Sequence, residues 1–80
     1  MSGRPEKHSL TLRGHRTSVS LEAEFWQAFR EIAALRGIGV NALAVEVDEA
    51  RGDNPGLASA IRLFVLRHYR QAAVSPPARS

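Results

Sequence analysis

Apolar and polar positions alternate without a break along residues 15–21, HRTSVSL. At period two, one side of this stretch is apolar or β-branched and the other side is polar. The first side consists of Thr17, Val19 and Leu21, and the second of Arg16, Ser18 and Ser20. The pattern predicts a half-buried β-strand whose first side packs on the rest of the protein.

Residues 1–14 are expected to form a flexible basic arm, because residues 1–8 contain Gly, Pro and charged side chains without a period. Leu10 and Leu12 are exceptions, since they alternate with polar residues. They stand at even positions, whereas the apolar positions of the next strand are odd, so a continuous strand would place the two sets on opposite faces. One extra residue near Arg13-Gly14 would bring both sets onto one face, and glycine is common at such bulges. A bulged or broken extension is favoured, and a separate short strand or a loose lead-in stays open.

Three helices are expected from the 3.6-residue apolar period that begins at Glu22. They span residues 22–36, 40–51 and 55–72, and residues 73–80 are expected to form a disordered tail. Gly37 stands where a helix C-cap glycine belongs, and Asn54-Pro55 is typical of a helix start. The fold class is therefore mainly α with one N-terminal strand, in a single domain of residues 15–72.

A lone strand leaves backbone N–H and C=O groups unpaired along both edges, which is costly once one face is buried. The simplest partner is the same strand of a second copy, antiparallel across a two-fold axis. The sequence therefore predicts a homodimer.

Composition and charge narrow the function. The chain has 80 residues and no cysteine, which agrees with a reducing cytoplasm, and no apolar run approaches the ~20 residues of a membrane span. The N-terminal residues also lack the apolar core of a secretory signal. Residues 1–20 carry four basic side chains against one acidic one, whereas residues 21–80 carry seven of each. This local positive excess indicates an anionic partner, with nucleic acid first.

The order of these parts resembles the ribbon-helix-helix DNA-binding proteins, the superfamily of the Arc and MetJ repressors. The resemblance rests on HRTSVSLEAEFW, the turn and second helix RGIGVNAL, and the later SAIRLFVLRHYR, which looks like a bacterial subgroup with an additional C-terminal helix. It implies an intertwined homodimer with an intermolecular antiparallel two-stranded ribbon. It also implies a transcriptional regulator that binds double-stranded DNA, with higher oligomers on DNA left open.

In such dimers the ribbon enters the major groove and its outward side chains read base edges. This assigns base contacts to Arg16, Ser18 and Ser20. The family also holds phosphate at the N-terminus of its second helix. This assigns phosphate contacts to Gly39, Val40 and Asn41, with Arg13, just before the strand, and the arm residues Arg4 and Lys7 as further candidates. Gly39 departs from the Ser or Thr common in the family, which removes a hydroxyl but keeps the backbone donor.

Other chemistry has less support. The spacing of His8 and His15 matches no zinc pattern, no cysteine or nearby carboxylate completes a site, and we expect no metal and no cofactor. His15 has the opposite parity to Ser18 and Ser20, with no orienting acid, so an enzyme is not expected. The apolar third helix leaves one alternative open, a protein-interaction or antitoxin-like module that uses this helix.

Overall fold

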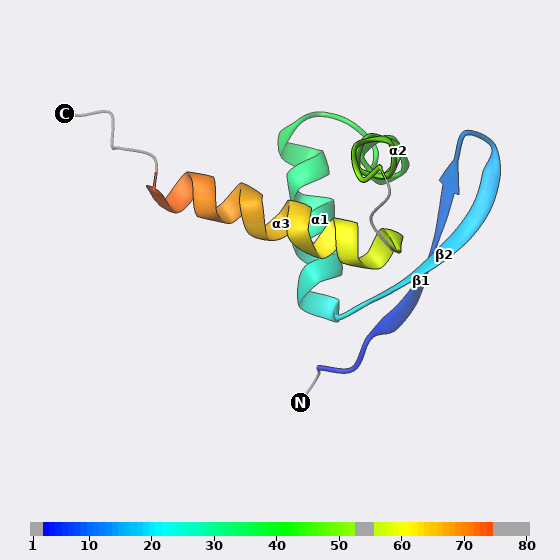
Figure 1. Ribbon diagram of the computed structural model, residues 1–80, viewed down its shortest axis with the longest axis horizontal. Coiled ribbons are helices and arrows are strands. Elements are labelled where there is room, and N and C mark those ends of the chain that lie inside the picture. The colour runs from blue at the N-terminus through cyan, green and yellow to red at the C-terminus, as the bar shows by residue number, and fades with distance from the viewer. Residues whose placement is uncertain (1–2, 53–55, 75–80) are drawn as a thin grey trace.

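The computed structural model describes residues 3–52 and 56–74 and has an antiparallel two-stranded ribbon followed by three helices (Figure 1). The elements are β1 (Glu6–Leu12), β2 (His15–Leu21), α1 (Ala23–Leu35), α2 (Val40–Ala50) and α3 (Leu57–Val74). The expected class, a mainly α ribbon-helix-helix fold with a third helix, is confirmed, although the ribbon forms within one chain and not between two. The expected start of the third helix at 55 and residues 75–80 of the expected tail lie outside the described residues, whereas Ala73 and Val74, also expected in the tail, belong to α3.

The expected flexible arm and the favoured bulged extension are wrong for residues 6–12, which form a separate strand, β1, as in the alternative left open. This strand pairs with β2 of the same chain, from Glu6 opposite Leu21 to Leu12 opposite His15. The connection has only two residues, Arg13 and Gly14, with φ of 52° and 81°. Positive φ at both positions is the geometry of the tight hairpin turn whose twist matches that of the strands. The predicted bulge at Arg13-Gly14 is therefore a hairpin turn.

The turn also explains the change of parity between the two apolar sets. Residues directly opposite each other in a hairpin share a face, and each pair here joins an even position to an odd one. Leu10 and Leu12 therefore lie on the same face as Val19 and Leu21, and all four are buried. No extra residue is needed to align them.

The core lies between this face and the three helices. Strand β1 packs on α2, whereas β2 packs on α1 and α3. The helices contribute fully buried side chains, namely Phe29, Ile32, Leu43 and Ile61. Complete burial of such a side chain contributes about 1.5–3 kcal/mol. Because all three helices share this core, α3 is an integral part of the domain.

Thr17 does not pack on the helices as the alternation predicts. It lies on the inner side of β2 opposite Leu10, but it is exposed. The reason is that, near the turn of the hairpin, α2 packs against β1. Leu10 and Leu12 therefore make the contacts with the helices that the alternation predicts for Thr17.

A glycine-terminated turn sets the start of α2. Gly37, with φ of 70°, donates its N–H to Ala34 O at 3.0 Å, and Ile38 donates to Ala33 O at 3.0 Å. These two bonds are the Schellman arrangement that ends a helix and satisfies its last carbonyls. The predicted C-cap at Gly37 is confirmed, and only Ile38 and Gly39 separate it from α2.

Candidate nucleic-acid interface

The outward face of the ribbon is polar along its whole length. Arg16, Ser18 and Ser20 are exposed on β2, as the alternation predicts. The register places three further exposed polar residues opposite them on β1, namely Thr11, Ser9 and Lys7. From the sequence, Lys7 is expected only as an arm residue near phosphate, and the row itself is missed, because residues 1–14 are assigned to an arm. The alternation of Lys7, Ser9 and Thr11 with His8, Leu10 and Leu12 is the signal that could have found it.

The N-terminus of α2 lies beside the ribbon. Gly39 is its N-cap, with φ −74° and ψ 159° and no side-chain cap, and Leu43 N donates to Gly39 O at 3.1 Å. The N–H groups of the first turn have no partner within a helix, and they carry the positive end of its dipole. Val40 is half-buried and Asn41 is exposed.

One hydrogen bond connects this helix start to the ribbon. The backbone N–H of Thr11 donates to Asn41 Oδ1 at 3.0 Å. Thr11 is also the residue directly opposite Arg16. The structure therefore brings Arg16, predicted to contact bases, close to the helix end predicted to contact phosphate.

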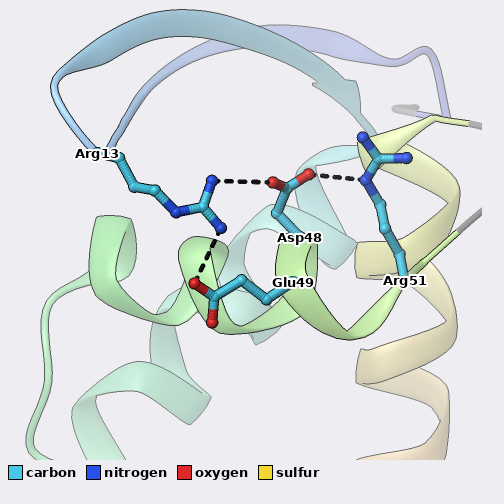
Figure 2. Close-up of polar contacts among 4 residues, drawn as sticks. All are labelled: Arg13, Asp48, Glu49 and Arg51. Atoms are coloured by element: carbon cyan, nitrogen blue, oxygen red, sulfur yellow. Dashed lines mark hydrogen bonds and ion pairs between the residues drawn. The ribbon is translucent and has the colours of Figure 1, made fainter.

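Arg13 has a different environment from the one expected. Its guanidinium donates to Glu49 Oε2 at 3.0 Å and lies 3.6 Å from Asp48 Oδ2, both on α2 (Figure 2). Asp48 in turn accepts from Arg51 Nε at 2.7 Å (Figure 2). The hydrogen bond from Arg51, assisted by Arg13, holds the pKa of Asp48 below its usual range. Arg13 thus anchors the hairpin turn to α2.

A second anchor holds the opposite end of the ribbon. Arg62 of α3 donates to both carboxylate oxygens of Glu22, at 2.9 and 3.2 Å, and to the carbonyl of Ser20 at 3.4 Å. The bond from Arg62 lowers the pKa of Glu22, with help from the residue's own backbone N–H. Glu22 lies at the junction of β2 and α1. The ribbon is therefore fixed to the helices at both ends.

The outward face keeps its positive charge because its cations are not neutralised. The ion pairs of the described residues involve Arg13, Arg36, Arg51 and Arg62, together with His8 beside Glu6. Neither Lys7 nor Arg16 takes part in any of these pairs. This face therefore presents two cations that have no ion-pair partner in the part of the chain that the structure describes, set among hydroxyl groups.

The histidines have structural surroundings. The His8 ring stacks on Trp26 with 4.1 Å between centroids and an interplanar angle of 9°, and its Nε2 lies 3.8 Å from Glu6 Oε1. His68 meets Tyr69 edge to face at 4.9 Å. Within residues 3–52 and 56–74, no cluster of His, Cys, Asp and Glu has the arrangement of a metal site. None of the helices in the same part of the chain has the length and apolar character needed to span a membrane.

A polar, basic ribbon fixed beside the uncapped start of a helix is typical of proteins that recognise DNA with β-strands. The comparison with protein families identifies the group. Residues 5–69 match the ribbon-helix-helix domain, and the chain belongs to this family. The family consists generally of DNA-binding regulators, as the sequence resemblance predicts.

A solved structure has a similar fold. It is that of an uncharacterized protein from Bordetella pertussis Tohama I, which is 35% identical to this chain and superposes with a TM-score of 0.74. The alignment covers 92% of this chain but 63% of that protein, so the chain spans less than two thirds of its relative's length. A search of curated proteins found no significant match.

Proposed function

We propose that the protein is a sequence-specific DNA-binding protein that regulates transcription from within the cytoplasm. The outward face of its ribbon enters the major groove, where Arg16 offers a bidentate fork to guanine O6 and N7. Ser18 and Ser20 add hydrogen bonds that discriminate less strongly. The observation that carries the proposal is the exposed polar face, which a hydrogen bond joins to the start of α2 and whose cations have no ion-pair partner among the described residues.

Phosphate contacts are proposed for the backbone N–H groups at the start of α2, contributed by Gly39, Val40 and Asn41. The free donors and the helix dipole both favour an anion there. Because the Asn41 side chain is bonded to Thr11, a phosphate held at this helix end keeps the ribbon in register with the groove. For Arg13, a phosphate contact requires the guanidinium to leave Glu49 and Asp48, so its net contribution is smaller.

We also propose a homodimer. Strand β1 already pairs with one edge of β2, so it is now the other edge of β2 that favours a dimer. In a tight hairpin the pair flanking the turn is hydrogen-bonded and the pairs alternate along the strands. The backbone groups of Arg16, Ser18 and Ser20 therefore point away from β1. A second copy can pair antiparallel along this edge, with Ser18 on the two-fold axis, which makes β2 the centre of an intermolecular ribbon.

Substitution of Arg16 tests the readout. We expect R16A to lose about 1–3 kcal/mol of discrimination at one base position of each half-site, since a bidentate contact has that value. The measurement is in vitro selection of bound DNA, followed by titration of operator variants. R30A, which removes an exposed charge from α1, is the control and is expected to keep the selected sequence. An unchanged base preference in folded R16A would remove the ribbon from the mechanism.

The alternative, an interaction or antitoxin-like module acting through the third helix, has less support. α3 buries Ala60, Ile61 and Val65 in the chain's own core, which accounts for part of its apolar character, while its Leu63, Leu66 and Tyr69 are exposed. Selection that recovers no DNA consensus at physiological salt would favour this alternative.

A further inference from the structure

Strand β1 presents a second polar row beside the one that is proposed to read bases. Lys7, Ser9 and Thr11 lie opposite Ser20, Ser18 and Arg16 in the register, and all are exposed on the outward face. Residues on one face of a strand recur about every 6.8 Å, twice the rise of one base pair. The row therefore follows the DNA over the same length as the row on β2.

This row belongs to a fixed surface. Near its turn end, the Thr11 N–H is bonded to Asn41 of α2. Toward the other end, the ring of His8 is stacked on Trp26 of α1. A side chain carried by β1 consequently keeps a constant lateral offset from β2.

The lateral distance between β1 and β2 determines which part of the DNA each strand contacts. A dimer joined through β2 has four strands, with the two β2 strands in the middle and a β1 strand on each side. Because neighbouring strands lie about 4.8 Å apart, each β2 strand lies about 2.4 Å from the two-fold axis and each β1 strand about 7 Å from it. The major groove is about 12 Å wide, which places its walls about 6 Å from the same axis. β2 therefore lies over the base edges, whereas β1 lies over the walls, where the phosphates are.

We infer that β1 is a phosphate-contacting strand that flanks the reading strand, with Lys7 as its charged contact and Ser9 and Thr11 as hydroxyl donors. The inference rests on the proposed function and adds, for each chain, one site of contact with the DNA phosphate backbone. Lys7 suits this role better than Arg13, because Arg13 is already paired with two carboxylates on α2. Lys7 has no such partner among residues 3–52 and 56–74.

The salt dependence of DNA binding by the full chain separates a phosphate contact from a base contact. Each phosphate neutralised contributes about 0.9 to the slope of log affinity against log salt. We expect K7A to lower the magnitude of this slope by about one per chain, or about two per dimer, on the DNA selected by the unmodified protein. Selection with K7A is expected to return the same consensus, whereas R16A changes it.

R70A is the charge-matched control, because Arg70 is exposed near the end of α3 that lies away from the ribbon (Figure 1). We expect it to leave the slope unchanged. A wild-type slope in K7A overturns the inference alone, and so does a changed consensus in K7A, which would place β1 inside the groove. Absence of DNA binding by the unmodified chain would instead overturn the proposed function and the inference with it.

Discussion

At the scale of single residues, Asp48 links two parts of the molecule that are distant in sequence. Its side chain is only 20% exposed and meets Arg13 from the hairpin turn as well as Arg51 from the end of its own helix. In the sequence, Arg13 is an isolated cation just before a strand, and for this reason a phosphate contact is predicted for it. The ion pair between Arg13 and Asp48 depends on how the hairpin packs on α2, and no local pattern reveals that packing.

The lowered pKa values of Asp48 and Glu22 predict an acid-sensitive stability. A carboxylate whose pKa is lower in the folded state stabilises the fold above its unfolded pKa, near 4, and this contribution is lost as pH falls through the folded value. We expect the free energy of unfolding, measured by urea denaturation, to fall below about pH 4. D48N should be less stable at pH 7 and should lose less on acidification. Equal losses in D48N and the unmodified protein would contradict this assignment.

At the scale of elements, most of the fold could be predicted because its signals are local. The period-two and period-3.6 patterns predict β2 and three helices, and Gly37 marks the end of the first helix. β1 is missed because its turn carries Arg13 where hairpins usually have Asn or Asp, so that Arg13-Gly14 resembles a bulge. Because β1 is not predicted, its half of the outward polar face is not predicted either.

Gly14 provides a test of the turn. Its φ of 81° is unfavourable for a residue with Cβ, although an added Cβ would meet no atom within 4 Å. We therefore expect G14A to lose about 1–2 kcal/mol of stability from backbone conformation alone. G14N is the matched control and should lose less, because asparagine tolerates this region. Both variants would be compared by denaturant unfolding, and equal losses would argue against a strained turn.

At the scale of the whole molecule, the two edges of the ribbon are not equivalent. The outer edge of β1 is bonded to α2 through Thr11 and Asn41. On the outer edge of β2, the carbonyl of Ser20 accepts a bond from Arg62, and the backbone of Arg16 and Ser18 faces away from β1. The proposed dimer uses the edge of β2 around Arg16 and Ser18, and the Ser20 carbonyl, which has a second lone pair, can accept from a second copy as well as from Arg62.

Proline substitution tests this edge selectively. The N–H groups of Ser18 and Ser9 both point away from the hairpin partner, so either proline spares the in-chain ladder. We expect S18P to sediment at 8.8 kDa, the mass of one chain, while the unmodified protein and S9P sediment at twice that mass. Dimers of S18P as stable as those of S9P would exclude pairing through β2.

The two-residue connection between the strands has a kinetic consequence. A ribbon assembled only from two chains would form in a second-order encounter and would fail to form at high dilution. Here β2 meets its first partner across Arg13 and Gly14, and hairpins of this kind close in about 1–10 μs. The ribbon can thus form at a rate that is independent of protein concentration, so that each newly made chain covers one edge of β2 before it meets another copy.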